Sequence, residues 1–152
     1  MSIRRLRSTT AMDEGSILPL IAGASALALA VILVVTAVTS LYLDYKRLLS
    51  IADAAALVGA EAYDLSEIVV EGGTVVATLD PARVRGAVES HLGEFLSGPV
   101  PVDDLHLVRA TSLDGRSATV TLAARWSPPL LAPFIPDGLP VEATSTARSV
   151  FG

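Results

Sequence analysis

The chain has 152 residues, a formal net charge of −5 at pH 7 and no cysteine. The lack of cysteine excludes a disulfide framework and thiolate chemistry. Acidic residues outnumber basic ones by 16 to 11, and the excess lies after Leu43, so we expect no nucleic acid as a partner.

Residues 1–14 form a short polar leader that we expect to be disordered. Its basic residues are Arg4, Arg5 and Arg7. Basic residues in the short flank of a membrane segment mark its cytoplasmic side. We therefore predict a cytoplasmic leader and an extracytoplasmic C-terminal part.

The next stretch, from Ser16 to Leu43, contains no charged side chain. As a helix it would be about 42 Å long, which exceeds the ~30 Å hydrocarbon core of a bilayer. A secretory signal peptide has a shorter apolar region, of about 7–15 residues, and ends in small residues. We therefore expect a permanent membrane helix. The alternative, cleavage near residues 40–45, would release a secreted soluble protein.

The helical pattern continues beyond this apolar stretch, so Gly15 to Ala62 is predicted to be one long helix. Its first two-thirds would lie in lipid, with Tyr42 and Tyr45 at the headgroup level. Its last third has an apolar stripe at helical spacing and charged residues on the other faces. The stripe is Leu48, Ala52, Ala55 and Val58, and the charged residues are Lys46, Arg47, Asp53 and Glu61.

Small residues recur every four positions within the apolar stretch, at Ala22, Ala26 and Ala30. Small residues at this spacing share one helix face and let two membrane helices approach closely. They are candidate residues for helix packing in the membrane. The alternative is that alanine is simply common in this chain.

Residues 63–152 are predicted to form one small extracytoplasmic α+β domain. β-branched runs at 68–70 and 75–79 flank a Glu-Gly-Gly-Thr turn and predict a hairpin. Asp80-Pro81 is typical of a helix N-cap and first turn, and Gly98-Pro99 of a helix end. The apolar positions between them are Val84, Val88, Leu92 and Phe95.

A second hairpin is predicted from residues 105–112 and 117–126 across Asp114-Gly115, followed by a last strand over 139–150. Alternation along these strands predicts one covered face and one solvated face. The inward set is Ala118, Val120, Leu122, Ala124 and Trp126, with Val141, Ala143 and Ala147. The outward set is Ser117, Thr119, Thr121 and Arg125, with Glu142, Thr144, Thr146 and Arg148.

The segment between the last two strands, residues 127–138, is rich in proline, which holds it extended or turned. Its large apolar residues are Leu130, Leu131, Phe134 and Ile135. Apolar loop residues of this kind either close an open edge of the core or form a contact patch for partner subunits or the membrane surface.

The sequence contains no constellation typical of catalysis or metal binding. His91 and His106 lack the spacing of metal ligands, such as H-x-x-x-H. Asp103 and Asp104 are adjacent in a predicted loop and lack a partner base, and the nucleophile motif G-x-S-x-G is absent. We therefore expect no enzyme, no catalytic residue, no metal site and no cofactor.

The long helix resembles that of the TadE/TadG-like proteins of the tight-adherence (Tad/Flp) pilus system. In that family a type IV pilin-like N-terminal helix is followed by an aspartate, one or two basic residues and an alanine-rich ADAAAL-like block. The matching residues are Asp44, Lys46, Arg47, Ala52, Asp53, Ala54, Ala55, Ala56 and Leu57. The similarity covers residues 14–62 and is only architectural beyond them. A generic alanine-rich helix is the alternative explanation.

The resemblance implies a single-pass, membrane-anchored, pilin-like accessory subunit, such as a minor pilin, of a Tad/Flp-type pilus or related secretion apparatus. The implied partners are the membrane, other pilin-like subunits or assembly proteins, and a prepilin peptidase. Gly15-Ser16 matches the bond that this peptidase cleaves, although Leu20 stands where polymerised pilins carry glutamate. A membrane-tethered binding module of the cell envelope, unrelated to a filament, is the alternative function.

Overall fold

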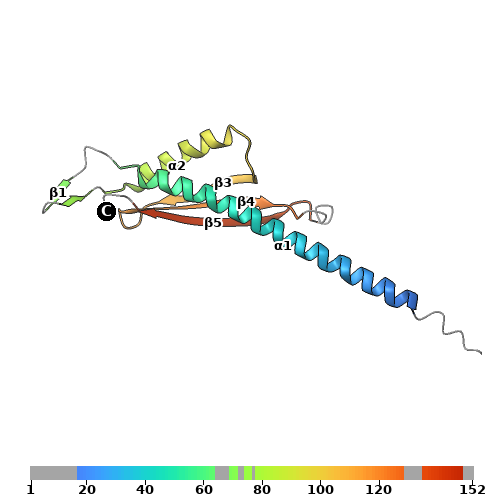
Figure 1. Cartoon of the computed structure of the whole chain (residues 1–152). Helices are drawn as coiled ribbons and strands as arrows, with labels where there is room; N and C mark the ends of the chain where they lie inside the picture. Colours follow the sequence, from blue (N-terminus) through green and yellow to red (C-terminus); the bar gives the residue numbers. More distant parts are fainter. Residues whose placement is uncertain (1–16, 64–68, 72–73, 77, 129–134, 149–152) are drawn as a thin grey trace, which may run out of the picture. The chain divides into compact units, whose positions relative to one another are not determined.

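The computed structural model describes residues 17–63, 69–71, 74–76, 78–128 and 135–148 (Figure 1). The elements are α1 (Ile17–Ala60), β1 (Val69–Glu71), β2 (Thr74–Val76), α2 (Pro81–Leu96), β3 (Asp103–Thr111), β4 (Ser117–Trp126) and β5 (Leu139–Arg148). Internal contacts divide the chain into two units, Met1–Thr36 and Ala37–Gly152. The predicted long helix is confirmed over Ile17–Ala60.

In the first unit, every described residue from Ile17 to Thr36 is helical and exposed. The hydroxyl of Thr36 donates to the carbonyl of Ile32 at 2.8 Å, so this polar group is satisfied within the helix. Helix α1 is long and apolar enough to cross a membrane, a property that it shares with N-terminal signal sequences.

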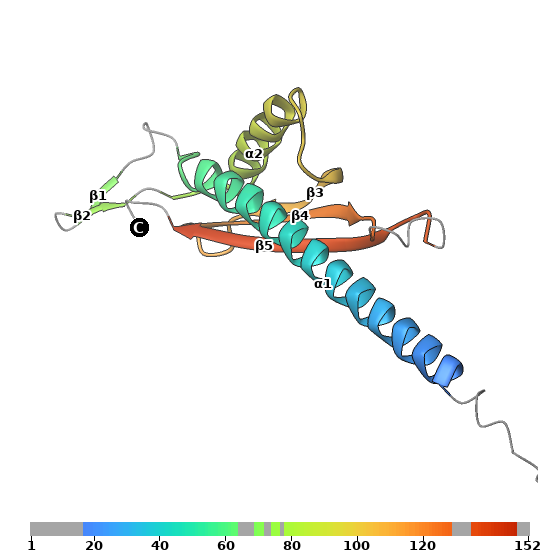
Figure 2. The same ribbon diagram turned by 45° about the vertical axis from the view of Figure 1, so that its right-hand side comes forward.

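The second unit is built on an antiparallel sheet with the strand order β3-β4-β5 (Figures 1 and 2). Strand β4 is central and pairs with β5 without interruption, from Ser117–Arg148 to Trp126–Leu139. The pairing of β3 with β4 contains irregularities on both sides of His106 and Leu107. One of them includes Asp104, whose φ of 52° lies in the left-handed region.

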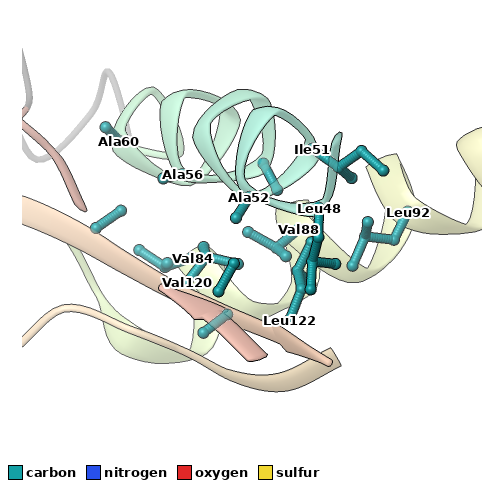
Figure 3. Packing of buried hydrophobic residues seen from close by; sticks show 14 of the residues in the cluster. Leu48, Ile51, Ala52, Ala56, Ala60, Val84, Val88, Leu92, Val120 and Leu122 are labelled. Atoms are coloured by element: carbon teal, nitrogen blue, oxygen red, sulfur yellow. The ribbon is translucent and has the colours of Figure 1, made fainter. Parts of the chain in front are cut away.

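The core of this unit lies between one face of the sheet, α2 and the last part of α1 (Figure 3). Apolar side chains on that face of β4 meet a stripe of α1 and the predicted stripe of α2, which confirms both periodic patterns. The α1 residues are Leu48, Ile51, Ala52, Ala55, Ala56 and Ala60, and the others include Val84, Val88, Leu92, Ala118, Val120, Leu122 and Ala124. Val58 is only half-buried, whereas Gly59 beside it is buried.

Small residues let α1 come close to its neighbours. A Cβ added at Gly59 would lie 3.1 Å from the Cβ of Ala118 and 3.1 Å from a methyl group of Val84. Helix α1 also contacts the last residue of β4, where the indole Nε1 of Trp126 donates to the hydroxyl of Ser40 at 3.2 Å. Close helix–sheet packing is therefore supported by a specific hydrogen bond at the far end of β4.

Helix α2 begins as predicted, with Asp80 as the N-cap and Pro81 in the first position. The carboxylate of Asp80 accepts from the backbone N–H of Ala82 at 2.8 Å. The helix ends before the cap residue Ser97, whose hydroxyl donates to the carbonyl of Glu94 at 2.6 Å.

The first predicted hairpin forms, but in a shorter version. Strand β2 ends at Val76 instead of residue 79, and Leu79 is buried in the core instead of extending the strand. The backbone N–H of Leu79 donates to the carbonyl of Gly115 at 2.8 Å, so this residue belongs to the main core. Ile68, Ala77 and the two glycines of the turn lie outside the described residues.

Two predictions about the sheet are wrong. Asp103 and Asp104 lie in β3 rather than in a preceding loop, because Asp103 pairs with Arg125 of β4. Thr121 was expected on a wet surface but is buried on the central strand, between Arg109 of β3 and Thr144 of β5, and its hydroxyl pairs with that of Thr144 at 2.9 Å. The remaining outward residues of β4 are half-buried or exposed, as predicted.

Strand β5 is confirmed with its predicted alternation up to Arg148, and residues 149–152 lie outside the described part. In the segment before it, Pro128 is fully buried and Ile135 half-buried, while Leu130, Leu131 and Phe134 lie outside the described residues. The predicted α+β class is confirmed. A long apolar N-terminal helix is followed by a helix and a three-stranded antiparallel sheet that pack against it, which is a pilin-like layout.

Candidate functional site

The residues with potential catalytic chemistry do not converge. The structure places His91 on α2 and His106 on β3, where its Nδ1 lies 2.9 Å from the carbonyl oxygen of Asp104. Among the described residues, no group of three histidine, aspartate or glutamate side chains could hold a metal ion.

Asp104 instead takes part in an ion pair that joins the strands to the segment before β5. Its carboxylate accepts from Nη2 of Arg125 at 3.1 Å, and Nη1 of the same arginine donates to the carbonyl of Asp137 at 2.6 Å. Gly138 follows with a φ of 61°, and a Cβ there would lie 2.8 Å from Arg125 Cγ. The cluster shapes the turn before β5, and both charged side chains are about half exposed.

The structure divides the ADAAAL block of α1 into two groups. Ala52, Ala55 and Ala56 are completely buried in the core. Asp53, Ala54 and Leu57 are exposed, and Leu57 keeps 54% of its surface although it is a large apolar residue. Burial in the domain core therefore explains the three buried alanines and leaves the other three residues outside the core.

The charged residues that precede this block lie on the same helix. Arg47 donates to the carboxylate of Asp44 at 2.9 Å, one turn apart. Lys46 does not join this pair, and its Nζ lies 5.7 Å from the centre of the Tyr42 ring, as in a cation–π contact. Of the two basic residues that follow Asp44, Arg47 therefore forms the ion pair.

The candidate packing residues Ala22, Ala26 and Ala30 are helical and exposed in the first unit, as is Leu20. Among the residues described there, none buries a side chain against another part of the chain. Their predicted role in membrane packing remains a prediction. The candidate cleavage site at Gly15 and Ser16 lies outside the described residues.

Sequence reasoning missed an apolar groove in the second unit. It has a volume of about 600 Å³ and lies between α1 residues Val38 to Tyr45 and the sheet residues Trp126 and 139–142. The only signal in the sequence is the concentration of aromatic residues near Leu43. The partners of those residues come from strands about 80 to 100 positions later, so only the fold reveals the groove.

The turn between β3 and β4 contains a perturbed carboxyl group. Oδ1 of Asp114 accepts from the backbone N–H groups of Arg116 at 2.9 Å and Ser117 at 2.7 Å, and Oδ2 accepts from the Ser117 hydroxyl at 2.9 Å. These hydrogen bonds, the one from Arg116 first, lower the pKa of Asp114 to about 2. The carboxylate stabilises the predicted Asp-Gly turn, in which Gly115 has a φ of 66°.

Comparison with protein-family models, curated proteins and solved structures finds no match for the chain.

Proposed function

We propose that this protein is a membrane-anchored, pilin-like accessory subunit of a Tad/Flp-type pilus or a related secretion apparatus, with a structural rather than a catalytic role. The observation that carries the proposal is the change from exposed to buried side chains along α1. Its first part is apolar and exposed over every described residue, and its last part is the central piece of a folded domain. This is the arrangement expected of a subunit that is anchored by one helix and presents a domain outside the membrane.

The membrane role is supported by the side chains of the first part of α1. Leu, Val and Ile cover all sides of the helix from Ile17 onward, with no charged residue before Asp44. A helix that is apolar all round requires an apolar environment on all sides. The three arginines of the leader support a cytoplasmic N-terminus and a domain outside the cytoplasm.

The assembly role is supported by the exposed half of the ADAAAL block. Asp53 and Leu57 lie one turn apart on a solvent-facing side of α1, where the domain core does not use them. In the TadE/TadG-like pattern that the chain resembles, these positions are part of the recurring block. We propose that they contact a neighbouring pilin-like subunit or assembly protein.

The first experiment determines the N-terminus of the protein recovered from membranes, by mass spectrometry, with and without the prepilin peptidase. A start at Ser16 that depends on the peptidase supports a processed pilin-like subunit despite Leu20. An intact leader supports a permanent membrane scaffold. A start near residues 40–45 contradicts the anchor and establishes a secreted protein.

The second experiment tests the proposed contact by site-specific photocrosslinking in cells. A benzoylphenylalanine at Leu57 is expected to capture a pilin-like or assembly protein. The matched control carries benzoylphenylalanine in place of Leu113, which is 86% exposed on the β3–β4 turn. A membrane-inserted protein that yields no crosslink at Leu57 contradicts the assembly role and favours a tethered binding module. Point substitution is required, because deletion of residues 48–62 would remove the core.

A further inference from the structure

The apolar groove of the second unit lies at the end of the charge-free stretch. Val38 and Leu41, which line it, belong to that stretch, and the first charged residue of α1 is Asp44, less than one turn beyond Leu41. If the charge-free stretch is in the bilayer, as the proposed function requires, the groove lies at the level of the membrane surface. The aromatic side chains in its walls, Tyr42, Tyr45 and Trp126, are the types that favour this level.

The groove is apolar inside and carries opposite charges at its borders. Tyr42 forms part of its wall, and the ammonium group of Lys46 lies 5.7 Å from the centre of that ring. No described carboxylate forms an ion pair with Lys46. On the opposite wall, Glu142 of β5 is exposed. A ligand with an apolar tail, one anionic group and one cationic group would match this arrangement.

We propose that the groove binds a zwitterionic glycerophospholipid of the membrane. One acyl chain lies between α1 and β5, the phosphate lies near Lys46, and the cationic amine lies near Glu142. The volume of about 600 Å³ is within the range of about 300–1,000 Å³ found for small-molecule sites. The inference rests on the proposed membrane anchor, and it adds a specific lipid contact that fastens the domain to the bilayer surface.

The test uses the intact chain and its single tryptophan, which lines the groove. The protein is reconstituted into phosphatidylcholine vesicles whose acyl chains carry bromine, a short-range quencher of indole fluorescence. We expect the protein to float with the vesicles and Trp126 to be strongly quenched. When the brominated lipid is diluted with an unbrominated, uncharged glycolipid, quenching should be half-complete at a mole fraction of brominated lipid well below one half, as for a site that prefers the phospholipid headgroup.

Two pairs of variants distinguish the groove from general proximity to lipid. Val141→Phe fills the groove and should remove most of the quenching, whereas Val108→Phe, on an exposed position of β3, should not. Lys46→Glu should weaken the preference by more than about fivefold, because it removes one exposed ion pair with the phosphate and adds a repulsive charge. Arg85→Glu makes the same charge change on α2 and should leave the preference unchanged. Lys46 and Arg85 are both exposed, and the ion pair of Arg85 with Glu89 at 2.7 Å is also exposed and contributes little to stability, so neither substitution threatens folding.

The outcomes separate this proposal from the function on which it rests. A protein that floats with the vesicles but shows no quenching keeps its anchor and contradicts the lipid site. Emission that is blue-shifted, unquenched and dependent on the protein-to-lipid ratio identifies a second copy in the groove and also overturns it. A protein that fails to float contradicts both the anchor and the lipid site.

Discussion

Helix α1 contains two apolar regions that differ in the exposure of their side chains. From Ile17 to Thr36 the helix carries large apolar side chains and leaves all of them exposed. From Leu48 to Ala60 it buries one face, which consists mostly of alanine and glycine. Apolar content alone therefore does not determine the environment of a helix. The size of the side chains and their distribution around the axis do.

The physical reason lies in the surface that each region must contact. Lipid chains adapt their shape, so large side chains on every side of a helix are solvated well by a bilayer. A sheet and a second helix are rigid, and α1 approaches them closely only where its residues are small. At Gly59 the approach is close, because even one added carbon would contact both Ala118 and Val84.

The largest effect is expected from charge in the buried face. Ala55→Glu places an unpaired carboxylate at a completely buried position, and we expect it to lower the free energy of unfolding by about 3–5 kcal/mol. Ala54→Glu, one residue earlier but exposed, should change it by less than about 0.5 kcal/mol. Urea unfolding in detergent, followed by Trp126 fluorescence, measures both. Equal losses of unfolding free energy would show that the two faces of this region do not differ in burial.

A charge introduced in the first region tests whether that region lies in lipid. Val31 and Leu57 are both 54% exposed, so exposure alone predicts equal tolerance of arginine. If only the first lies in lipid, Val31→Arg should disfavour insertion by about 2.5–3.5 kcal/mol, while Leu57→Arg leaves insertion unchanged. Flotation and resistance to carbonate extraction measure insertion. Normal insertion of both variants would contradict a membrane position for Val31.

Local signals were sufficient to predict most of the second unit. Asp80-Pro81 identified the start of α2, and the alternation from Ala118 to Trp126 identified the buried face of β4. Predictions failed where the partner of a residue is distant in sequence. Asp103 is in a strand because Arg125 pairs with it, and Thr121 is buried on the central strand, between Arg109 and Thr144.

The same limit applied to the candidate site. Sequence pattern selected the ADAAAL block but could not separate its buried alanines from Asp53 and Leu57, because either face of an alanine-rich helix could meet the sheet. The groove was missed because its walls come from α1 and from β4 and β5. Residue type indicates which positions are unusual, and the fold shows which of them share a surface.

A smaller effect is expected where the close approach of α1 is altered by one carbon. Gly59→Ala adds a methyl group 3.1 Å from two core atoms, and we expect the free energy of unfolding to fall by about 1 kcal/mol after the gain in helix propensity. Gly93→Ala, in α2 with no neighbouring atom within 4 Å, should raise it by about 0.5–1 kcal/mol. Opposite signs in urea unfolding support tight packing at Gly59, and stabilisation by both variants argues against it.

The smallest effect separates the two regions by their response to acid. Residues 17–36 contain no ionisable side chain, so their membrane insertion should not change between pH 5 and pH 2. The folded unit contains Asp114, whose pKa is lowered from 3.8 to about 2 by the hydrogen bonds from Arg116 and Ser117. A carboxyl group with a lowered pKa stabilises the fold above its unfolded pKa, and this contribution is lost as the pH falls towards 2.

Asp114→Asn retains an acceptor for the backbone N–H groups but does not titrate. The stability difference between the wild type and this variant should therefore be constant above about pH 4 and shrink towards pH 2. A difference that stays constant down to pH 2 would mean that the Asp114 carboxylate does not stabilise the turn through its charge.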